Sequence, residues 1–455
     1  MSKTFIGCGA GFAGDRFDAA VPIVATLAGM PGERFLTYEV LAERTLAIAQ
    51  KLRRSNPDQG YSPFLDTYLP LVLADCKRHG IRIVTNMGAA NPLGAARRVH
   101  ALARELGVKG LKVAAVTGDD LLATLTEAEV RGYPIIEGLA LGNRPIVAAN
   151  AYLGAQPVAR ALATGADVVL VGRTTDAALS LAPLLHVHGW RADELDRLAQ
   201  GTLCGHLLEC GAQVTGAYFP DPGFKDVPDL ANVGFPIAEI GSDGDLIVTK
   251  AANTGGLVSR ATVIEQILYE MHDPHNYLTP DVVLDVGEVT VDEVGPNRVR
   301  VQGARGKPPP PTLKATVCVD AGWLGEGEIS YVGPNALARA DLAAAVVRAR
   351  CRAIGVADPV RVEVLGTQST FDNNTQRRRV RVSPPNDGEY RVRAAVRSAS
   401  RKVAQQVSDE VLSLYCSGPA GGCGVRQHVT AQVGTASILV DRMKVKATVT
   451  VVEPA

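Results

Sequence analysis

The sequence has no surplus of charge of either sign. Its 47 Lys and Arg residues balance 47 Asp and Glu residues, so the formal net charge is +0. Proteins that bind phosphate backbones or anionic bilayers need a basic surface, so we expect neither nucleic acid nor membrane as a partner. No apolar stretch reaches the roughly 18 residues of a membrane span, and residues 1–4 lack the layout of a signal peptide. We therefore expect a cytoplasmic protein.

Cysteine and histidine motifs are also missing. The eight cysteines are scattered without a Cys-x-x-Cys pair, and no two histidines have zincin spacing. We expect reduced, mostly buried thiols and no obligatory cofactor. Carboxylate-bound Mg²⁺ leaves little trace in a sequence, so the metal stays open.

The order of apolar runs predicts the fold. Up to about residue 185, short β-branched runs at 4–7, 81–85, 112–116, 146–149 and 167–171 alternate with amphipathic stretches. This pattern predicts an α/β domain over residues 1–355, with a mostly parallel Rossmann-like sheet, helices on both faces and a loop-rich part at 185–330. Residues 356–455 alternate charged and apolar positions, which predicts a smaller antiparallel α+β domain.

Polar loops follow several of the expected strands. Residues 9–14 formally match the dinucleotide fingerprint, but Glu39 is the only nearby acid for a ribose, so a tight turn without a ligand is the stronger alternative. Loops at 85–92, 117–120 and 172–176 should meet the first loop, because the carboxyl ends of parallel strands face one crevice. In the last loop, Arg173 and Asp176 form a pair that can bind a carboxylate or phosphate.

The middle of the chain concentrates reactive side chains in residues 206–216. His206, Glu209 and Cys210 flank Leu207 and Leu208. If the leucines bury this segment, Glu209 loses solvation and its pKa rises toward values suited to general acid or base catalysis. A structural His206–Glu209 ion pair with Cys210 as core filler explains the pattern equally well.

Two further loops can close over a substrate, one at 218–226 and one at 254–256. Our candidate catalytic residues are Glu209, Cys210, His206 and Asp176. Our candidate substrate-binding residues are Gly9, Gly11, Gly14, Asp15, Arg16, Asn86, Asn91, Asn150, Arg173, Gln213, Lys225, Gly255 and Gly256.

Long unbroken words of the sequence resemble the AtuA family of acyclic terpene utilisation proteins. They lie at residues 6–16, 41–45, 85–92, 149–154, 165–169, 205–216, 221–228, 268–270 and 418–422. The resemblance implies work on the branched acyl-CoA intermediates of citronellol and geraniol catabolism, which are carboxylated, hydrated and cleaved. The sequence departs from the family pattern at 367–374 and carries Cys423 where glycine is common, which leaves the substrate open.

These observations favour a lyase or hydratase that acts on an acyl-CoA or a branched hydroxy- or keto-carboxylate. Glu209 would be the acid or base, and Arg173 would hold a carboxylate or phosphate. One alternative is acyl transfer or thioester hydrolysis with Cys210 as nucleophile and His206 as base. Another is a non-catalytic scaffold subunit that binds a metabolite. We expect a homo-oligomer in each case.

Overall fold

The computed structural model describes residues 3–366 and 388–454. The chain divides into two compact units, which we call unit 1 (residues 1–142, 146–318 and 435–455) and unit 2 (residues 143–145 and 319–434). The sequence suggested a boundary near residue 355, whereas this division falls inside strands β15 (Thr312–Val332) and β18 (Cys423–Asp441). A continuous strand has no change of composition that would mark such a boundary. The departure from the family pattern at 367–374 lies outside the described residues.

Unit 1 is built on a 10-stranded mixed sheet with the order β12-β13-β9-β8-β1-β2-β3-β7-β4-β19. Its parallel centre consists of β1 (Lys3–Cys8), β2 (Glu33–Tyr38), β3 (Ile81–Thr85), β7 (Val168–Val171) and β4 (Val113–Thr117). Its antiparallel flanks are β8 (Pro236–Gly241), β9 (Leu246–Lys250), β13 (Arg298–Gln302), β12 (Thr290–Gly295) and β19 (Thr448–Val452). The expected mostly parallel sheet is therefore mixed, and a Rossmann-like arrangement is not confirmed, because β1 borders antiparallel β8 instead of a second parallel half.

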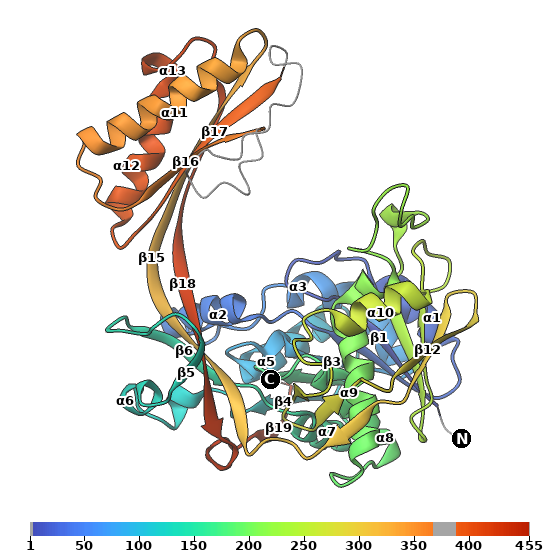
Figure 1. The fold of residues 1–455 in the computed structure, drawn as a ribbon. Coiled ribbons are helices and arrows are strands. Elements are labelled where there is room, and N and C mark those ends of the chain that lie inside the picture. The colour runs from blue at the N-terminus through green and yellow to red at the C-terminus, as the bar shows by residue number, and fades with distance from the viewer. Residues whose placement is uncertain (1–2, 367–387, 455) are drawn as a thin grey trace. The chain divides into compact units, whose positions relative to one another are not determined.

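Helices cover both faces of this sheet, as the unbroken apolar runs predict (Figure 1). Alternate residues of each central strand enter different cores: Ile6 and Val169 belong to one, and Phe5 and Val168 to the other. The first core is covered by α7 (Ala155–Ala163), α8 (Ala178–His188), α9 (Leu195–Glu209) and α10 (Arg260–Leu268). The second is covered by α1 (Ala20–Ala28), α4 (Leu73–His79) and α5 (Pro92–Glu105).

Residues 185–330 are more regular than the sequence suggested. They contain α9 and four strands of the large sheet (β8, β9, β12 and β13). The sequence does not predict α9, because its glycines are unfavourable in a helix. These glycines allow α9 to lie close to α8: a Cβ at Gly201 would lie 2.6 Å from Leu181, and one at Gly205 would lie 2.4 Å from the carbonyl oxygen of Ala177. Helix propensity is here overridden by close packing.

Shorter elements complete unit 1. They are α2 (Glu43–Ser55), α3 (Leu65–Tyr68), α6 (Glu127–Arg131), β5 (Ile135–Gly138), β6 (Ile146–Ala151), β10 (Tyr277–Leu278), β11 (Val283–Asp285) and β14 (Arg305–Lys307). Of all helices in residues 3–366 and 388–454, none combines the length and the apolar character needed to cross a membrane.

Unit 2 has the antiparallel α+β character that its period-two pattern predicts. Strand β17 (Glu389–Ser398) pairs antiparallel with β16 (Val360–Leu365) and with β15. Helices α11 (Ala336–Ala353) and α12 (Arg401–Leu412) pack on this sheet around an alanine- and valine-rich core, and α13 (Leu414–Ser417) follows.

The contact between α9 and α8 gives a stability test. Alanine normally stabilises a helix interior relative to glycine by up to about 1 kcal/mol. In Gly205→Ala the new methyl group would meet the backbone of Ala177, so we expect a net destabilisation of about 1–3 kcal/mol. Urea unfolding of both proteins measures this difference. An unchanged or raised midpoint would mean that α9 does not lie this close to α8.

Candidate functional site

The carboxyl ends of the parallel strands place polar residues at one edge of the sheet. Each central strand is followed there by a polar residue or loop: residues 9–15 after β1, Glu39 after β2, Asn86 after β3, Asp119 after β4 and Arg173 after β7. This is the edge at which open α/β sheets bind ligands. The expected convergence of loops is present in the geometry.

Arg173 lies at the centre of this edge, with its side chain only 4% exposed. Its Nη1 donates to the carbonyl oxygen of Leu41 and, at 3.0 Å, to Oδ1 of Asp176. Its Nη2 lies 3.9 Å from Glu43 Oε1, and the guanidinium carbon is 4.2 Å from the Tyr152 ring centre. Burial opposes the charge, but the surrounding carboxylates outweigh it and raise the Arg173 pKa.

Three carboxyl groups interact with Arg173, namely Glu39, Glu43 and Asp176, and Glu209 interacts with Asp176. We call these four partly buried acids the carboxylate cluster. Burial, and then the charge of Asp176, raise the pKa of Glu39 to about 8. Burial also raises the pKa of Asp176, although Arg173 opposes it. For Glu43, Arg173 and the Tyr152 hydroxyl outweigh burial and lower the pKa. At neutral pH the cluster therefore holds both ionised and protonated carboxyl groups.

His206 and Glu209 belong to the last turn of α9 and face each other. Nδ1 of His206 lies 3.0 Å from Glu209 Oε1, and Nε2 lies 3.1 Å from the carbonyl oxygen of Ile267. Because a carbonyl only accepts, Nε2 must carry a proton. A neutral imidazole then accepts at Nδ1, so the hydrogen bond to Glu209 requires one further proton on either partner. Burial raises the pKa of Glu209, and Glu209 outweighs burial to raise that of His206.

Cys210 follows directly but has a different environment. Burial, and then the charge of Glu209, raise the pKa of its thiol well above the usual range. Nucleophilic cysteines need the opposite shift. Both ring nitrogens of His206 are occupied by Glu209 and Ile267, so His206 is not placed to deprotonate Cys210. The geometry favours Cys210 as a packed residue over the acyl-transfer alternative.

The first glycine loop holds this segment in place. A Cβ at Gly11 would lie 2.3 Å from the carbonyl carbon of Cys210, so only glycine lets the two backbones approach. The Gly11 amide donates to Asp15 Oδ2 at 2.9 Å. Helix α1 begins only at Ala20, so the loop does not open a helix as a dinucleotide fingerprint would. The loop thus joins the carboxylate cluster through packing.

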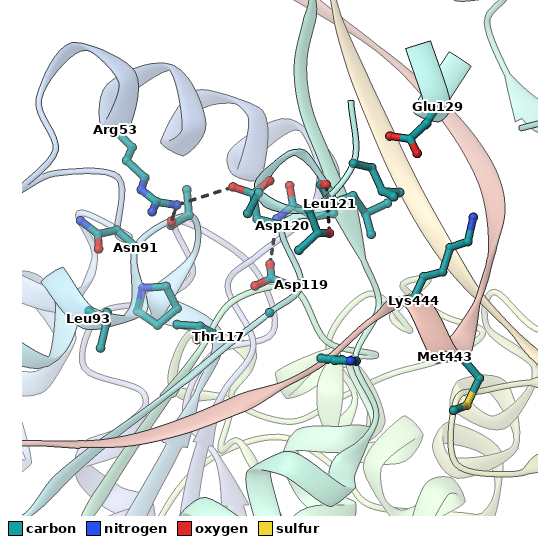
Figure 2. Close-up of a pocket in the computed structure, with 18 residues that line it drawn as sticks. Arg53, Asn91, Leu93, Thr117, Asp119, Asp120, Leu121, Glu129, Met443 and Lys444 are labelled. Atoms are coloured by element: carbon teal, nitrogen blue, oxygen red, sulfur yellow. Dashed lines mark hydrogen bonds and ion pairs between the residues drawn. The ribbon is translucent and has the colours of Figure 1, made fainter. Parts of the chain in front are cut away.

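A second feature is a hollow of about 640 Å³ beside the end of β4, which we call the β4 pocket. Its lining includes Asp119, Asp120, Arg53 and Lys444 (Figure 2). Figure 2 shows Arg53 and Asp120 pointing toward one another, and Lys444 lies on the other side of the view. Burial raises the pKa of Asp119 to about 6.

The remaining candidate residues fall into three groups. Asn86 supports the cluster: its amide donates to Glu39 Oε1 at 2.7 Å. Asn91, which caps α5, and Asn150, which donates to Asp119 at 2.8 Å, line the β4 pocket. The third group has its contacts outside these two features. Gly9 packs against Tyr38, Gly14 is exposed, Arg16 pairs with Asp18, and Gln213 lines a pocket of about 270 Å³ together with Tyr218. Lys225 pairs with Glu265, Gly255 packs against Asp229, and Gly256 packs against Thr215.

Comparison with protein families identifies the chain. The family model described as "Acyclic terpene utilisation family protein AtuA" matches residues 4–451. The chain belongs to the AtuA family. Comparisons with curated proteins and with solved structures gave no match. Membership in the AtuA family suggests a role in acyclic terpene utilisation, and it names no reaction.

Several residues of this AtuA site escaped the sequence reasoning. The sequence indicates Glu39 only as a candidate ribose ligand, and no pattern in it points to Glu43 or Tyr152 as site residues. Strand β2 had not been recognised, although its position before Glu39 is the signal that could have found that residue. Among residues 3–366 and 388–454, no group of three or more His, Cys, Asp or Glu side chains is arranged to hold a metal ion. The Mg²⁺ that the sequence left open has no candidate ligand set there.

The raised pKa of Glu39 gives a pH-dependent prediction for stability. Its carboxyl group ionises near 4.5 in an unfolded chain and at about 8 in the folded AtuA protein. The folded state therefore holds a proton that the unfolded state releases, and this contribution to stability falls as pH rises from about 4.5 to 8. Glutamine at position 39 keeps a carbonyl acceptor for Asn86 but cannot ionise.

We expect Glu39→Gln to raise the melting temperature relative to the wild type more at pH 9 than at pH 5. Differential scanning calorimetry at both pH values measures this gap. Glu105→Gln is the matched control, because Glu105 is an exposed acid on α5 with a lowered pKa owing to Arg98. A constant gap for Glu39→Gln would show that Glu39 ionises normally in the folded protein.

Proposed function

We propose that the protein is an acid–base enzyme, a lyase or hydratase that acts beside the carbonyl group of an acyl-CoA or a branched hydroxy- or keto-carboxylate. The observation that carries the proposal is the hydrogen bond between His206 and Glu209, which holds a proton near Asp176. Family membership supports a substrate from acyclic terpene utilisation.

Such a reaction needs a base and an acid on either side of a carbon–carbon or carbon–oxygen bond. In the elimination direction, Glu209 would take the proton from the carbon next to the carbonyl. Asp176 would give its proton to the leaving hydroxyl oxygen, which departs as water while the carbon–carbon double bond forms. The raised pKa values of both carboxyl groups suit these roles, because a carboxyl group with a raised pKa holds a proton more readily as an acid and is a stronger base once ionised.

Substrate access supports the same assignment. The side chains of Asp176 and Glu43 are 36% and 38% exposed, whereas that of Glu209 is 9% exposed. A ligand would reach the carboxylate cluster from the side of Asp176. Arg173 Nε is buried and has no hydrogen-bond partner among the described residues, so it is an available donor for a substrate oxygen. Its Nη1 already donates to Leu41 and Asp176, and its Nη2 faces Glu43. Arg173 therefore has less capacity to bind an anionic substrate than the sequence suggested.

The proposal predicts hydrogen exchange at the carbon next to the carbonyl. In D₂O the wild type should place deuterium there in at least one of a panel of branched, unsaturated and 3-hydroxy acyl-CoA thioesters, read by mass spectrometry. Glu209→Gln keeps the size of the side chain but cannot accept the proton. We expect it to slow exchange roughly a hundredfold or more.

Two controls separate the rival readings. Glu105→Gln should exchange at the wild-type rate, and so should Cys210→Ala if the thiol only packs. Loss of activity in Cys210→Ala alone would favour thioester chemistry instead. Thermal stabilisation by the thioesters without exchange or product would favour a binding subunit that is not catalytic.

A further inference from the structure

The acidic side chains of the β4 pocket are satisfied by protein partners. Asp120 lies 3.6 Å from Arg53. Glu129 accepts at 2.8 Å from both the backbone amide and the hydroxyl of Thr126, with which it forms the capping box of α6. Asp119 is 4% exposed. It accepts hydrogen bonds from the side-chain amide of Asn150 at 2.8 Å and from the backbone amide of Arg173 at 2.9 Å. Each of these carboxylates therefore has a protein partner, and Glu129 also attracts the charge of Lys444.

The basic side chains of the pocket are less fully used. The side chain of Lys446 is exposed and forms no hydrogen bond or ion pair within residues 3–366 and 388–454. Lys444 Nζ contacts the Tyr133 hydroxyl at 3.1 Å, and Glu129 and Asp441 attract its charge. Arg53 Nη1 donates at 2.6 Å to the carbonyl oxygen of Ala90 as well as facing Asp120. Among the described residues, Lys446 is therefore a basic side chain of this hollow that has no protein partner, and it is available to an anionic ligand.

Apolar side chains form the rest of the wall. Leu121 and Leu125 line the hollow beside Leu93 and Met443. Leu93 is 37% exposed and Met443 is 79% exposed, so a ligand that covers them removes apolar surface from water. A hollow of about 640 Å³ lies in the range of small-molecule sites.

We propose that the β4 pocket binds an amphipathic anion, with its carboxylate or phosphate head at Lys444 and Lys446 and its hydrocarbon chain against Leu93 and Met443. None of the residues of the carboxylate cluster lines this hollow. The pocket is thus a second ligand site, and it goes beyond the acid–base chemistry proposed for Glu209.

Isothermal titration calorimetry with octanoate, octyl phosphate and 1-octanol tests the site. The wild type should bind at least one of the two anions saturably, and at least tenfold more tightly than the alcohol of equal chain length. The tighter anion identifies the head group. The double variant Lys444→Met, Lys446→Met should weaken anion binding roughly tenfold or more, because it removes both charge-assisted contacts to the head group.

Matched variants make the result specific. Lys402→Met, which removes an exposed lysine of α12, should bind the anion as the wild type does. Glu209→Gln should also bind normally, which separates this site from the carboxylate cluster. Met443→Asp replaces an apolar side chain of the wall with a negative charge, at a position too exposed to affect folding. It should weaken binding of the anion, because it removes apolar contact and repels the head group.

The proposal is overturned if neither anion binds the wild type, or if octanol binds as tightly as the anions. Wild-type affinity for the anion in both Met443→Asp and the lysine double variant would likewise place the ligand elsewhere. Loss of anion binding in Glu209→Gln would locate the head group in the carboxylate cluster and overturn the second site, without deciding whether Glu209 transfers protons.

Discussion

Burying a single guanidinium among several carboxyl groups is the constraint on which the candidate site depends. Arg173 is almost inaccessible to solvent and is shared between Asp176 and Glu43. A buried carboxylate is stable only when a cation or hydrogen-bond donors replace its hydration. One arginine cannot do this for every acid of the carboxylate cluster. Burial therefore prevails at Glu39, Asp176 and Glu209 and raises their pKa values, while Glu43, next to Arg173 and at the start of α2, has a lowered one.

The fold brings these acids together from distant parts of the chain by two devices. The parallel strands end at one edge, so Glu39 and Arg173 meet although they lie far apart in sequence. Glu209 reaches the cluster from the end of helix α9. The position of this segment depends on two glycines, because Gly205 allows close contact with the backbone of Ala177 and Gly11 allows close contact with the backbone of Cys210. The site is therefore positioned by backbone contacts, which hold side chains more rigidly than mobile loops would.

The sequence was sufficient for the parts of the fold that follow a regular pattern. β3 at residues 81–85 and the period-two strands of unit 2 were recognisable, because their apolar spacing reflects burial directly. β2 was missed because Arg34 and Thr37 interrupt its apolar run, and α9 was missed because Gly201 and Gly205 imitate loop composition. Hydrogen-bond partners that lie far apart in the sequence could not be predicted. No local pattern indicates that Asn86 donates to Glu39 or that Arg173 already donates to Asp176.

The structural explanation of the His206–Glu209 pair can be weighed against the catalytic one by charge. A pair that served stability alone would be compensated, with the acid ionised and its pKa lowered by the imidazolium. Here His206 does lower the pKa of Glu209, but burial and the charge of Asp176 act in the opposite direction and prevail. The fixed donor at Nε2 toward Ile267 then confines the labile proton to the bond between Nδ1 and Glu209. A proton held on one bond, beside a second acid that reaches solvent, is costly for stability and useful for transfer.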